Sequence, residues 1–502
     1  MRSPLPALLP VAIAAAFACG TASAADWMQF GYDAAHTGVN PAETLISPSN
    51  VASLVTKYSV AMAATVDSAP VYLSNVSTPA GTKNLLFAVS GDGRLMAIDA
   101  ATGTEVWHAT MSGNGHTTTA SPAIDPGRQY VYAYGNDGKA HKFQVGDGTE
   151  ITSGGWPQTI TTKPNVEKGA GGFTIANSGG VNWLYVASDG YIGDGGDYQG
   201  HLTTINLASG AQVVFNTLCS NMATHFGNGT CASRRSAIWG RGGATYDAAT
   251  DRVYIATGNG QYNASTGGLN WGDSTLALAL AGTGAGAGMP RDSYTPANFQ
   301  QLEDSDTDLG SISLVIMKAP AGSTVPHLGM QTGKDSKLRL INLDNMSGAG
   351  GPAHVGGELQ LLDVPRGQNG MSQQPATWVD GNGTSWLFVG NYSGISALTL
   401  GLNGSNVPQL TAAWQNTISA TSPIVANGIL YVISACSGGN CVVAYDPVHG
   451  NVLWTSAHVA PPHWQSPIIV NGVIYVMDNA GKLSAFGLDQ LPDEIFGNGF
   501  DS

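Results

Sequence analysis

Two residues in the segment Ile238–Asn263 have side chains suited to holding a flat ligand and a cation. Trp239 precedes a glycine-rich loop, and Asn259 lies in the turn Gly258–Gly260 after an alternating strand, Arg252–Ala256. A strand that buries one face ends at a rim, where its last residues are accessible. An indole there can stack on a planar ring, and an amide oxygen on a glycine turn can bind a hard cation. A buried core tryptophan and an asparagine in a tight turn would produce the same pattern.

Two charged segments follow farther along the chain. One is the acidic run Asp304–Asp308, and the other is Lys334 in a Gly-Lys-Asp turn. Such an acidic run is typical of a solvated loop or a structural calcium site, and a lysine in a turn is typical of the protein surface. Arg234 and Arg235 beside Cys231 could pair near a disulfide or face an anionic ligand. By residue types alone, none of these segments indicates a reaction.

The composition predicts that these residues are carried by many short β-strands. The 502 residues include 67 Gly and 25 Pro but only 11% charged residues, and long helical periodicities are scarce. Short apolar strands separated by turns are the usual product of such a composition. The expected fold class is therefore all-β, and the length suits one large propeller or barrel or several ordinary domains.

A repeated unit indicates which of these the chain forms. Each copy begins with Ser-Pro or Ala-Pro, turns on Gly or Asp-Gly between apolar strands, and closes with Thr-Gly before a strand that bears Trp; the clearest copy is Ser68–Ala109. About eight copies occur, at a period typical of propeller blades. We therefore predict an eight-bladed β-propeller of four-stranded antiparallel blades over residues 25–490, with a short tail at residues 491–502 of no assigned role.

The first and last repeats suggest how the ring closes. The last copy stops after Phe486 without its Trp-bearing strand, whereas a spare alternating strand, Leu54–Val60, precedes the first copy. Pairing the two would leave no unprotected sheet edge, which would otherwise template aggregation. We expect the N-terminal strand to complete the last blade.

Charge and targeting signals restrict the partners and the compartment. The formal net charge of -14 argues against nucleic acid or an anionic membrane surface as a partner. Residues 1–24 read as a signal peptide, with Arg2 before an apolar run and a mature start at Ala25. Cys19 offers a lipoprotein site as an alternative, although the residues before it match poorly. No later apolar run is long enough to span a bilayer, so we expect an exported protein, periplasmic or secreted.

The cysteines predict disulfides and exclude one cofactor. Cys219 with Cys231, and Cys436 with Cys441, are close pairs in an oxidising compartment, which favours two local disulfides over a metal site. The sequence has no Cys-x-x-Cys-His. It therefore carries no motif for covalently attached haem of the c type.

The repeat itself resembles that of a known family. Ala-x-Asp-x-x-Thr-Gly-x-x-x-Trp, at Ala97–Trp107 and more loosely at Ala444–Trp454, is similar to the repeat of the quinoprotein alcohol dehydrogenases, which depend on pyrroloquinoline quinone (PQQ), the polyvinyl-alcohol dehydrogenases among them. Non-catalytic outer-membrane assembly propellers share this repeat. The resemblance covers nearly all of the mature chain and is more specific for fold than for activity.

Within the resemblance, four residues match family positions in the same order. It implies that Trp239 forms the floor under PQQ and that Asn259 binds calcium. It also implies that Asp308 is the catalytic base, with Asp306 as the second choice. Lys334 matches the lysine or arginine that bonds the quinone oxygens. Because the four residues match in order and spacing, we favour one shared functional site over four separate structural roles.

The sequence also departs from the family at two places. The family glutamate that completes the calcium site is replaced by aspartates in residues 190–200, where Asp194 and Asp197 are the candidates. The adjacent cysteines that close the quinone pocket in many members are absent, because the corresponding residues 115–121 read GHTTTAS. His116 is the candidate replacement for that lid.

Two functions are therefore predicted as alternatives. The first is an exported quinoprotein dehydrogenase that oxidises a small or polymeric alcohol with PQQ and calcium and passes electrons to an external acceptor such as a cytochrome c. The second is a non-catalytic propeller that acts as a protein-interaction scaffold in the cell envelope. Convergence of Trp239, Asn259, Asp308 and Lys334 at the centre of the ring would favour the first.

Overall fold

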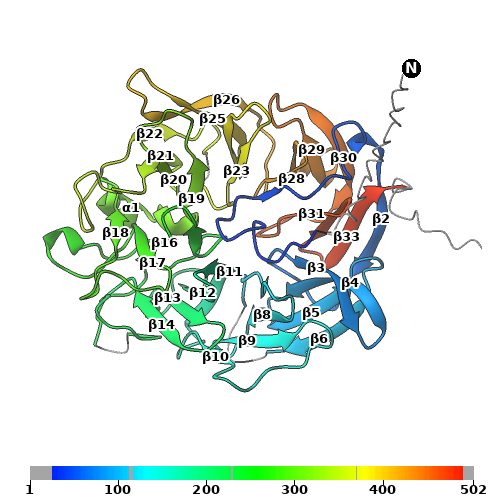
Figure 1. Ribbon diagram of the computed structural model, residues 1–502, viewed down its shortest axis with the longest axis horizontal. Helices are drawn as coiled ribbons and strands as arrows, with labels where there is room; N and C mark the ends of the chain where they lie inside the picture. The colour runs from blue at the N-terminus through cyan, green and yellow to red at the C-terminus, as the bar shows by residue number, and fades with distance from the viewer. Residues whose placement is uncertain (1–24, 112, 114–116, 228–229, 369, 490–502) are drawn as a thin grey trace, which may run out of the picture.

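The computed structural model describes residues 25–111, 113, 117–227, 230–368 and 370–489 as a ring of eight sheets around a central axis (Figure 1). One α-helix, α1 (Phe299–Ser305), and three short 3-10 helices, Val51–Ser53, Ala264–Thr266 and Leu309–Ser311, lie among these residues. The predicted all-β, eight-bladed propeller is confirmed. The predicted signal peptide, His116 and the tail at 491–502 lie outside the described residues.

The first four blades each contain four consecutive antiparallel strands. Blade 1 is β3 (Val71–Thr78), β4 (Gly81–Val89), β5 (Arg94–Asp99) and β6 (Glu105–Thr110); blade 2 is β7 (Ala123–Ile124), β8 (Tyr130–Tyr134), β9 (Lys139–Gln144) and β10 (Gln158–Thr159); blade 3 is β11 (Glu167–Ser178), β12 (Val181–Gly190), β13 (His201–Asn206) and β14 (Gln212–Asn216); blade 4 is β15 (Thr245–Asp247), β16 (Arg252–Ala256), β17 (Thr275–Ala279) and β18 (Asp292–Tyr294).

The other four blades repeat this plan, and the last one takes its outer strand from the start of the chain. Blade 5 is β19 (Val315–Lys318), β20 (His327–Gln331), β21 (Lys337–Asn342) and β22 (Gln360–Asp363); blade 6 is β23 (Ala376–Val379), β24 (Ser385–Asn391), β25 (Gly394–Leu402) and β26 (Pro408–Gln415); blade 7 is β27 (Ile424–Ala426), β28 (Ile429–Cys436), β29 (Gly439–Tyr445) and β30 (Val452–Val459); blade 8 is β31 (Ile468–Val470), β32 (Val473–Met477), β33 (Lys482–Leu488) and β2 (Leu54–Ala61).

The ring closes as predicted. Strand β2 pairs antiparallel with β33, from Leu54 opposite Leu488 to Ala61 opposite Lys482. The one departure from four strands per blade is β1 (Val39–Asn40), which adds in parallel to β27 and gives blade 7 a fifth strand. The closing pair joins the two ends of the ring in one sheet, so that the last blade has its outer strand.

The tryptophan and glycine of the repeat bind blade 1 to blade 2 and blade 6 to blade 7. Trp107, on the outer strand of blade 1, donates its indole N–H to the carbonyl of Val145 in blade 2 at 3.0 Å and packs against Gly148. Trp414 of blade 6 contacts Pro447 and Gly450 of blade 7 in the same way. Gly148 has a positive φ of 73° and no room for a side chain beneath the indole, which explains why the repeat requires glycine at this turn.

The apolar core is divided among the interfaces between neighbouring blades. One cluster joins blades 1 and 2 through residues such as Phe87 and Val131. Another joins blades 7, 8 and 1, with Tyr431, Ile474 and Leu86 among its fully buried members. Because each blade is held by its two neighbours, the loops at the faces of the ring can vary without loss of the core.

The strands and the N-terminal segment determine which face of the ring is open. The first strands of successive blades contact one another at the centre, as β11 does with β7 and β15. They begin at one face, called here the upper face, and end at the other, the lower face. Residues 28–38 cross the centre (Figure 1) and bond to inner strands of blades 2, 3, 4, 6 and 7, at Ile124, Ile175, Tyr246, Thr377 and Val425. This segment fills the centre of the ring below the loops of the upper face.

Both predicted disulfides are present. Cys219–Cys231 and Cys436–Cys441 have Cα–Cα distances of 5.9 Å each. Neither bridge spans two blades, so both restrain local loops, as the short spacing indicated. No helix in the described part of the chain has the length and apolar character needed to cross a membrane.

A buried histidine in blade 2 predicts a pH dependence of stability. His141 lies between Glu150, 2.6 Å from Nδ1, and Asp137, 3.1 Å from Nε2. Burial by itself lowers the pKa of His141, but the hydrogen bonds and charges of Asp137 and Glu150 outweigh it and raise the pKa above 6.5. The folded state therefore binds this proton more tightly than the unfolded state.

We expect this contribution to be complete below pH 6.5 and to be lost as the pH rises through the raised pKa. His141→Gln should lower the free energy of unfolding by roughly 1 kcal/mol more at pH 6 than at pH 9. Thermal unfolding of both proteins across this range measures the difference. A difference that grows with pH would contradict the assignment of a protonated His141.

Candidate functional site

The four residues predicted from the sequence lie on loops of the upper face in blades 4 and 5. Trp239 precedes β15, and Asn259 follows β16; Asp308 lies shortly before β19, and Lys334 follows β20. Because first strands begin at the upper face and second strands end there, these four loops share one end of the ring. The repeat therefore brings together residues that are up to 95 positions apart, from 239 to 334.

Their side chains make direct contacts. Asp308 is buried, accepts the backbone N–H of Asn259 at 2.6 Å, and forms an ion pair with the Lys334 ammonium. The same ammonium lies 5.2 Å from the centre of the Trp239 ring. Trp239 is half-buried, so one part of the indole is accessible beside a paired acid and amine.

Gly258 allows this close arrangement. A Cβ at Gly258 would lie 3.0 Å from Trp239 Nε1 and would overlap Asp308 Oδ1. The backbone N–H of Asn259, the next residue, can therefore reach the carboxylate only because residue 258 has no side chain. The glycine turn identified in the sequence positions the acid as well as the amide.

The side-chain oxygen of Asn259 is suited to a cation. The Nδ2 group donates to the Leu302 carbonyl at 2.8 Å, which fixes the orientation of the amide. The Oδ1 atom is buried and has no hydrogen-bond partner among the described residues. An unpartnered buried acceptor costs free energy, and a hard cation such as calcium would satisfy it.

Two further carboxylates, which the sequence reasoning did not assign to the site, surround Asn259. Asp273 is buried, accepts the Leu309 N–H at 2.9 Å, and has Oδ2 3.5 Å from Asn259 Nδ2. Burial raises the pKa of Asp273 well above its usual value, and the charges of Asp308 and Glu303 raise it further. Glu303 accepts the N–H of Gly260. Both acids therefore lie near the Asn259 turn, and carboxylate and amide oxygens are the ligand types that a hard cation prefers.

A third carboxylate comes from blade 3. Asp189, near the end of β12, is close enough to Asp308 and Asp194 for their charges to raise its pKa, although burial is the main cause of its rise to about 6. Lys168 Nζ lies 3.7 Å from Asp189 and acts in the opposite direction. A signal for Asp189 was present in the sequence, because it stands at the upper end of a predicted strand, as Asn259 does.

The other predicted residues have different surroundings. Asp194 accepts the hydroxyl of Tyr198 at 2.6 Å, and Asp197 forms an ion pair with Lys163 with its side chain 57% exposed. Asp306 ends α1 in a left-handed conformation, 72% exposed and 3.3 Å from Lys334. The metal assignment of Asp194 and Asp197 and the choice of Asp308 over Asp306 stay predictions.

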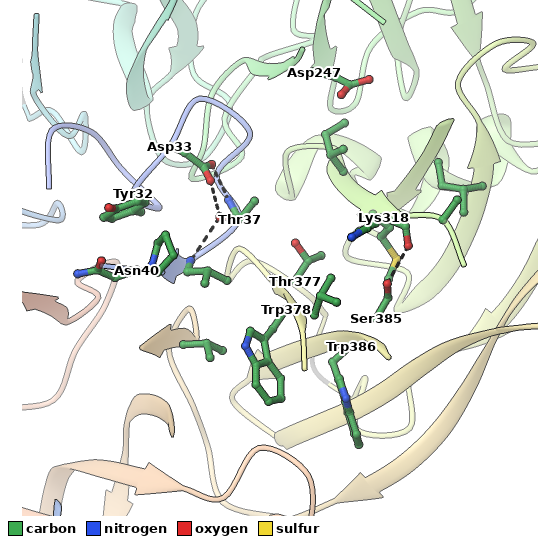
Figure 2. Close-up of a pocket in the computed structure, with 18 of the residues that line it drawn as sticks. Tyr32, Asp33, Thr37, Asn40, Asp247, Lys318, Thr377, Trp378, Ser385 and Trp386 are labelled. Carbon is green, nitrogen blue, oxygen red and sulfur yellow. Dashed lines mark hydrogen bonds between the residues drawn. The ribbon is translucent and has the colours of Figure 1, made fainter. Parts of the chain in front are cut away.

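A cavity of about 800 Å³ lies on the lower face, away from these residues. Figure 2 shows its lining between the N-terminal segment, at Tyr32 and Asp33, and blades 5 and 6, at Lys318, Trp378 and Trp386. The carboxylate of Asp33 already accepts from Ala35 and Thr37. None of the four predicted site residues lines this cavity.

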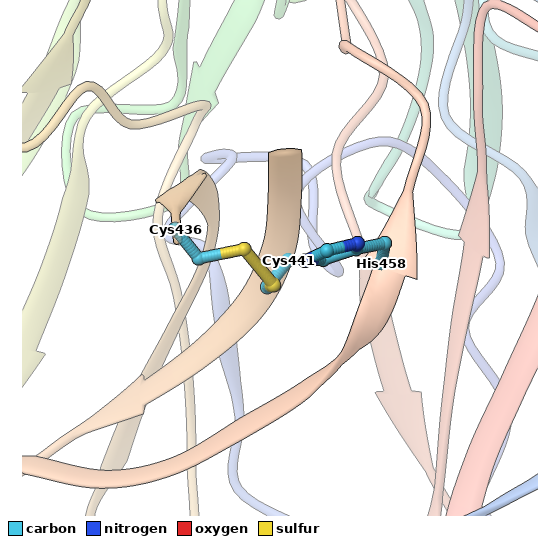
Figure 3. A group of neighbouring side chains, drawn as sticks. All are labelled: Cys436, Cys441 and His458. Atoms are coloured by element: carbon cyan, nitrogen blue, oxygen red, sulfur yellow. A yellow bond between two sulfur atoms is a disulfide. The ribbon is translucent and has the colours of Figure 1, made fainter. Parts of the chain in front are cut away.

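A cysteine and histidine group lies at the tip of the β28–β29 hairpin (Figure 3). Cys436, Cys441 and His458 bring their ligand atoms within 4.8 Å of one another. The two sulfurs are bonded to each other, and His458 Nε2 is 2.9 Å from the Ser437 carbonyl. With the thiols in a disulfide, this group offers no thiolate to a metal.

Comparisons with known proteins agree with the repeat and the ring. A PQQ-repeat family model, described as outer membrane protein assembly factor BamB, matches residues 59–168 and 406–490. No curated protein sequence matches this chain.

Solved quinoprotein structures have a similar fold. Quinohemoprotein alcohol dehydrogenases from Pseudomonas putida HK5 and from Comamonas testosteroni each show 14% identity and a TM-score of 0.60, covering 93% of this chain and 81% of theirs. A europium-containing methanol dehydrogenase shows 14% identity and a TM-score of 0.62, covering 92% of this chain and 98% of its own. The chain is therefore an eight-bladed β-propeller with the fold of the quinoprotein alcohol dehydrogenases, and its residues 59–168 and 406–490 match the PQQ-repeat family model.

Proposed function

We propose that this protein is a PQQ-dependent dehydrogenase that oxidises an alcohol with the help of a bound calcium ion. The observation that carries the proposal is the convergence of Trp239, Asn259, Asp308 and Lys334 on one part of the upper face. The structurally similar dehydrogenases are quinoproteins by name, and the methanol enzyme is described as containing europium, a hard cation. At 14% identity they support the fold, and the residues of this chain support the chemistry.

The residues present fit a planar cofactor and a cation. The accessible part of Trp239 offers a flat surface for stacking, and Lys334 beside it offers a charged hydrogen-bond donor to ring oxygens. Asn259 Oδ1 would hold the cation, with Asp308, Asp273 and Asp189 as the nearby carboxylates. A bound quinone supplies the acceptor for a hydride, and a bound calcium ion polarises the carbonyl that is reduced.

The protein groups would then handle protons and charge. Asp308 would accept the hydroxyl proton of the alcohol as its carbinol hydrogen leaves as hydride. Lys334 stays protonated, because Asp308 and Asp306 raise its pKa against the lowering effect of burial. Its positive charge would stabilise negative charge that develops on the ring oxygens.

The compartment and the electron acceptor follow from the same proposal. The two disulfides and the predicted signal peptide support an exported protein, periplasmic or secreted. Because the sequence has no c-type haem motif, electrons would pass to an external acceptor such as a cytochrome c. The substrate would be a small or a polymeric alcohol.

One observation favours a second function. The matching family model is described as an outer-membrane assembly factor, which supports a non-catalytic scaffold in the cell envelope. Under that alternative, the upper face would bind another protein, and the carboxylates near Asn259 would have no part in cofactor binding.

Turnover after cofactor loading distinguishes the two functions. The purified protein would be loaded with PQQ and calcium, and reduction of an artificial dye would be followed across primary, secondary and polymeric alcohols. We expect alcohol-dependent dye reduction that is lost when calcium is removed with a chelator. Absence of turnover with every alcohol, in protein that has bound PQQ, would favour the scaffold.

The unpartnered amide oxygen predicts the effect of removing it. Asn259→Ala should weaken calcium binding at least ~10-fold, because it deletes the buried acceptor that the cation would satisfy. Calorimetric titration of the PQQ-free protein with calcium measures this. Asn382→Ala, in an exposed turn, is the matched control. Equal calcium affinity in the Asn259 variant and the control would show that the cation does not bind there.

A further inference from the structure

A histidine–aspartate pair lies beside the candidate site, in loops that the sequence comparison with the dehydrogenase family did not use. His463 precedes β31 and Asp67 precedes β3, so both lie at the upper face. Nδ1 of His463 is 2.7 Å from Asp67 Oδ2, and the backbone N–H of Trp464 donates to Asp67 Oδ1 at 3.0 Å. The carboxylate thus binds both the imidazole and the peptide that follows it.

The rest of the loop holds the imidazole in place. The backbone N–H of His463 donates to Gln465 Oε1 at 2.7 Å, and its carbonyl accepts from Gln373 Nε2 at 3.1 Å. The His463 side chain is 42% exposed, and within the described part of the chain its Nε2 atom has no hydrogen-bond partner. Because Nδ1 faces a carboxylate, Nδ1 carries the proton of the neutral ring and Nε2 is a free acceptor.

A chain of ring contacts connects this acceptor to the candidate site. The His463 ring centre lies 4.7 Å from that of Trp464, and Trp464 meets Trp239 edge-on at 6.1 Å. Lys334 lies over the same Trp239 ring, at 5.2 Å. Trp464 therefore links the His463 ring to Trp239, the same ring that Lys334 contacts.

We propose that the Asp67–His463 pair is a second proton-accepting group of this site, with His463 Nε2 as the atom that receives the proton. This inference rests on the proposed dehydrogenase function. Oxidation of the alcohol moves two electrons and two protons out of the substrate in total. When an external one-electron acceptor removes the electrons from the reduced cofactor, its two hydroxyl protons must reach solvent.

The step balances with the groups named. For each electron that passes to the external acceptor, one O–H bond of the reduced cofactor would break and one N–H bond would form at His463 Nε2, so that two such events return the quinone. The imidazolium then loses this proton to water at the exposed upper face. Asp67 stabilises the imidazolium while it exists, in the way that a carboxylate supports a catalytic histidine in hydrolases.

The charges that face the pair are few among the described residues. Asp67 is the carboxylate in contact with His463. Asp67 also interacts electrostatically with the Arg241 guanidinium and with the Tyr392 hydroxyl. Lys334 is separated from His463 by the two indoles. Asp67 is therefore the charged group in direct contact with the imidazole.

The position of the imidazole can be tested without cofactor. Contact with an imidazole changes the emission of an indole, so at one fixed pH His463→Gln should change the tryptophan emission of the cofactor-free protein. His327→Gln, which removes a histidine on the lower face, should leave the emission unchanged. Equal emission from the wild type and His463→Gln would overturn the proposed contact.

The proton step is tested with the protein loaded with PQQ and calcium, by measuring the two half-reactions separately. In His463→Ala we expect unchanged PQQ binding and an alcohol-driven reduction rate within about twofold of the wild type. Reoxidation by the dye should slow at least ~10-fold, and added imidazole should restore it. The control is His327→Ala, which removes a histidine paired in the same way with Asp344 at 2.8 Å on the lower face.

The outcomes separate this inference from the proposed function. A wild-type protein that binds no PQQ overturns the proposed function, and the inference is overturned with it. If the wild-type protein turns over and the bound cofactor of His463→Ala is reoxidised at the wild-type rate, the inference alone is overturned. Slow reoxidation that imidazole does not restore would show that His463 only supports the loop, which also overturns it.

Discussion

Asp308→Asn should retain PQQ and lose turnover. The substitution keeps an oxygen that can accept the Asn259 N–H, but it removes the charge that would take the hydroxyl proton of the alcohol. General-base catalysis contributes about 10²–10⁴-fold, so we expect kcat to fall about a thousandfold. Dye reduction measures kcat, and the visible absorbance of bound PQQ shows whether the cofactor is retained.

Asp306→Asn is the matched control for this experiment. Asp306 also lies near Lys334, but its side chain is 72% exposed, whereas that of Asp308 is only 10% exposed. The control should keep kcat within about threefold of the wild type, since an exposed pair contributes little. If Asp306→Asn lost turnover and Asp308→Asn did not, the assignment of the base would be wrong and the second choice from the sequence correct.

Gly258→Ala should disable the site without a change in any charged residue. The added Cβ would overlap Asp308 Oδ1 and lie 3.0 Å from Trp239 Nε1. Asp308 is short and held by the Asn259 N–H, so the carboxylate, the indole or the turn must move. Misplacement of reacting groups by about 1 Å can cost 10²-fold in rate, and we expect a fall in kcat/KM of at least about that size.

Gly401→Ala provides the comparison, because Gly401 has open space around its Cβ position. This variant should keep wild-type activity. Both variants are assayed with the same dye as electron acceptor. Measurement of kcat/KM, together with a melting curve for each protein, separates a displaced carboxylate from general unfolding. Wild-type activity in Gly258→Ala would show that Asp308 does not need its present position.

The fold was predictable because its signals are local and repeated. The turn glycine and the tryptophan of the repeat recur because an indole such as Trp107 packs on the glycine of the next blade, here Gly148. The missing strand of the last repeat and the spare strand at residues 54–60 predicted the closing pair β2–β33. The parallel strand β1 was not predicted, since two residues carry too little periodicity to detect.

The site was predictable only in part. Trp239, Asn259, Asp308 and Lys334 were named because they match positions of the resembled family in the same order, and the contacts between them agree with a common site. Which carboxylates surround Asn259 depends on how loops from blades 3, 4 and 5 meet, and this is a long-range property. The family resemblance offered Asp194 and Asp197 in place of a family glutamate, whereas Asp189 is the blade 3 carboxylate whose pKa the charge of Asp308 raises.

Asp273 was noted only as part of a Gly-Asp stretch that the resembled family shares, and neither Asp273 nor Glu303 was given a role in the site, for a related reason. A Gly-Asp dipeptide and a glutamate in a short helix are common in turns and on surfaces. Their role becomes visible only when Asp273 is buried next to Asn259 and Glu303 meets the N–H of Gly260. The pairing of Asp67 with His463 spans 396 residues, and no pattern within the sequence joins them.

Equilibrium binding of PQQ tests the central claim most directly. The protein would be titrated with PQQ in the presence of calcium and again with a chelator, and the visible absorbance of the quinone and the quenching of tryptophan fluorescence would be followed. We predict saturable binding of one PQQ per chain that weakens without calcium and is lost in Trp239→Ala. Absence of saturable binding in the wild type, or equal binding by Trp239→Ala, would contradict a quinone site built on this indole.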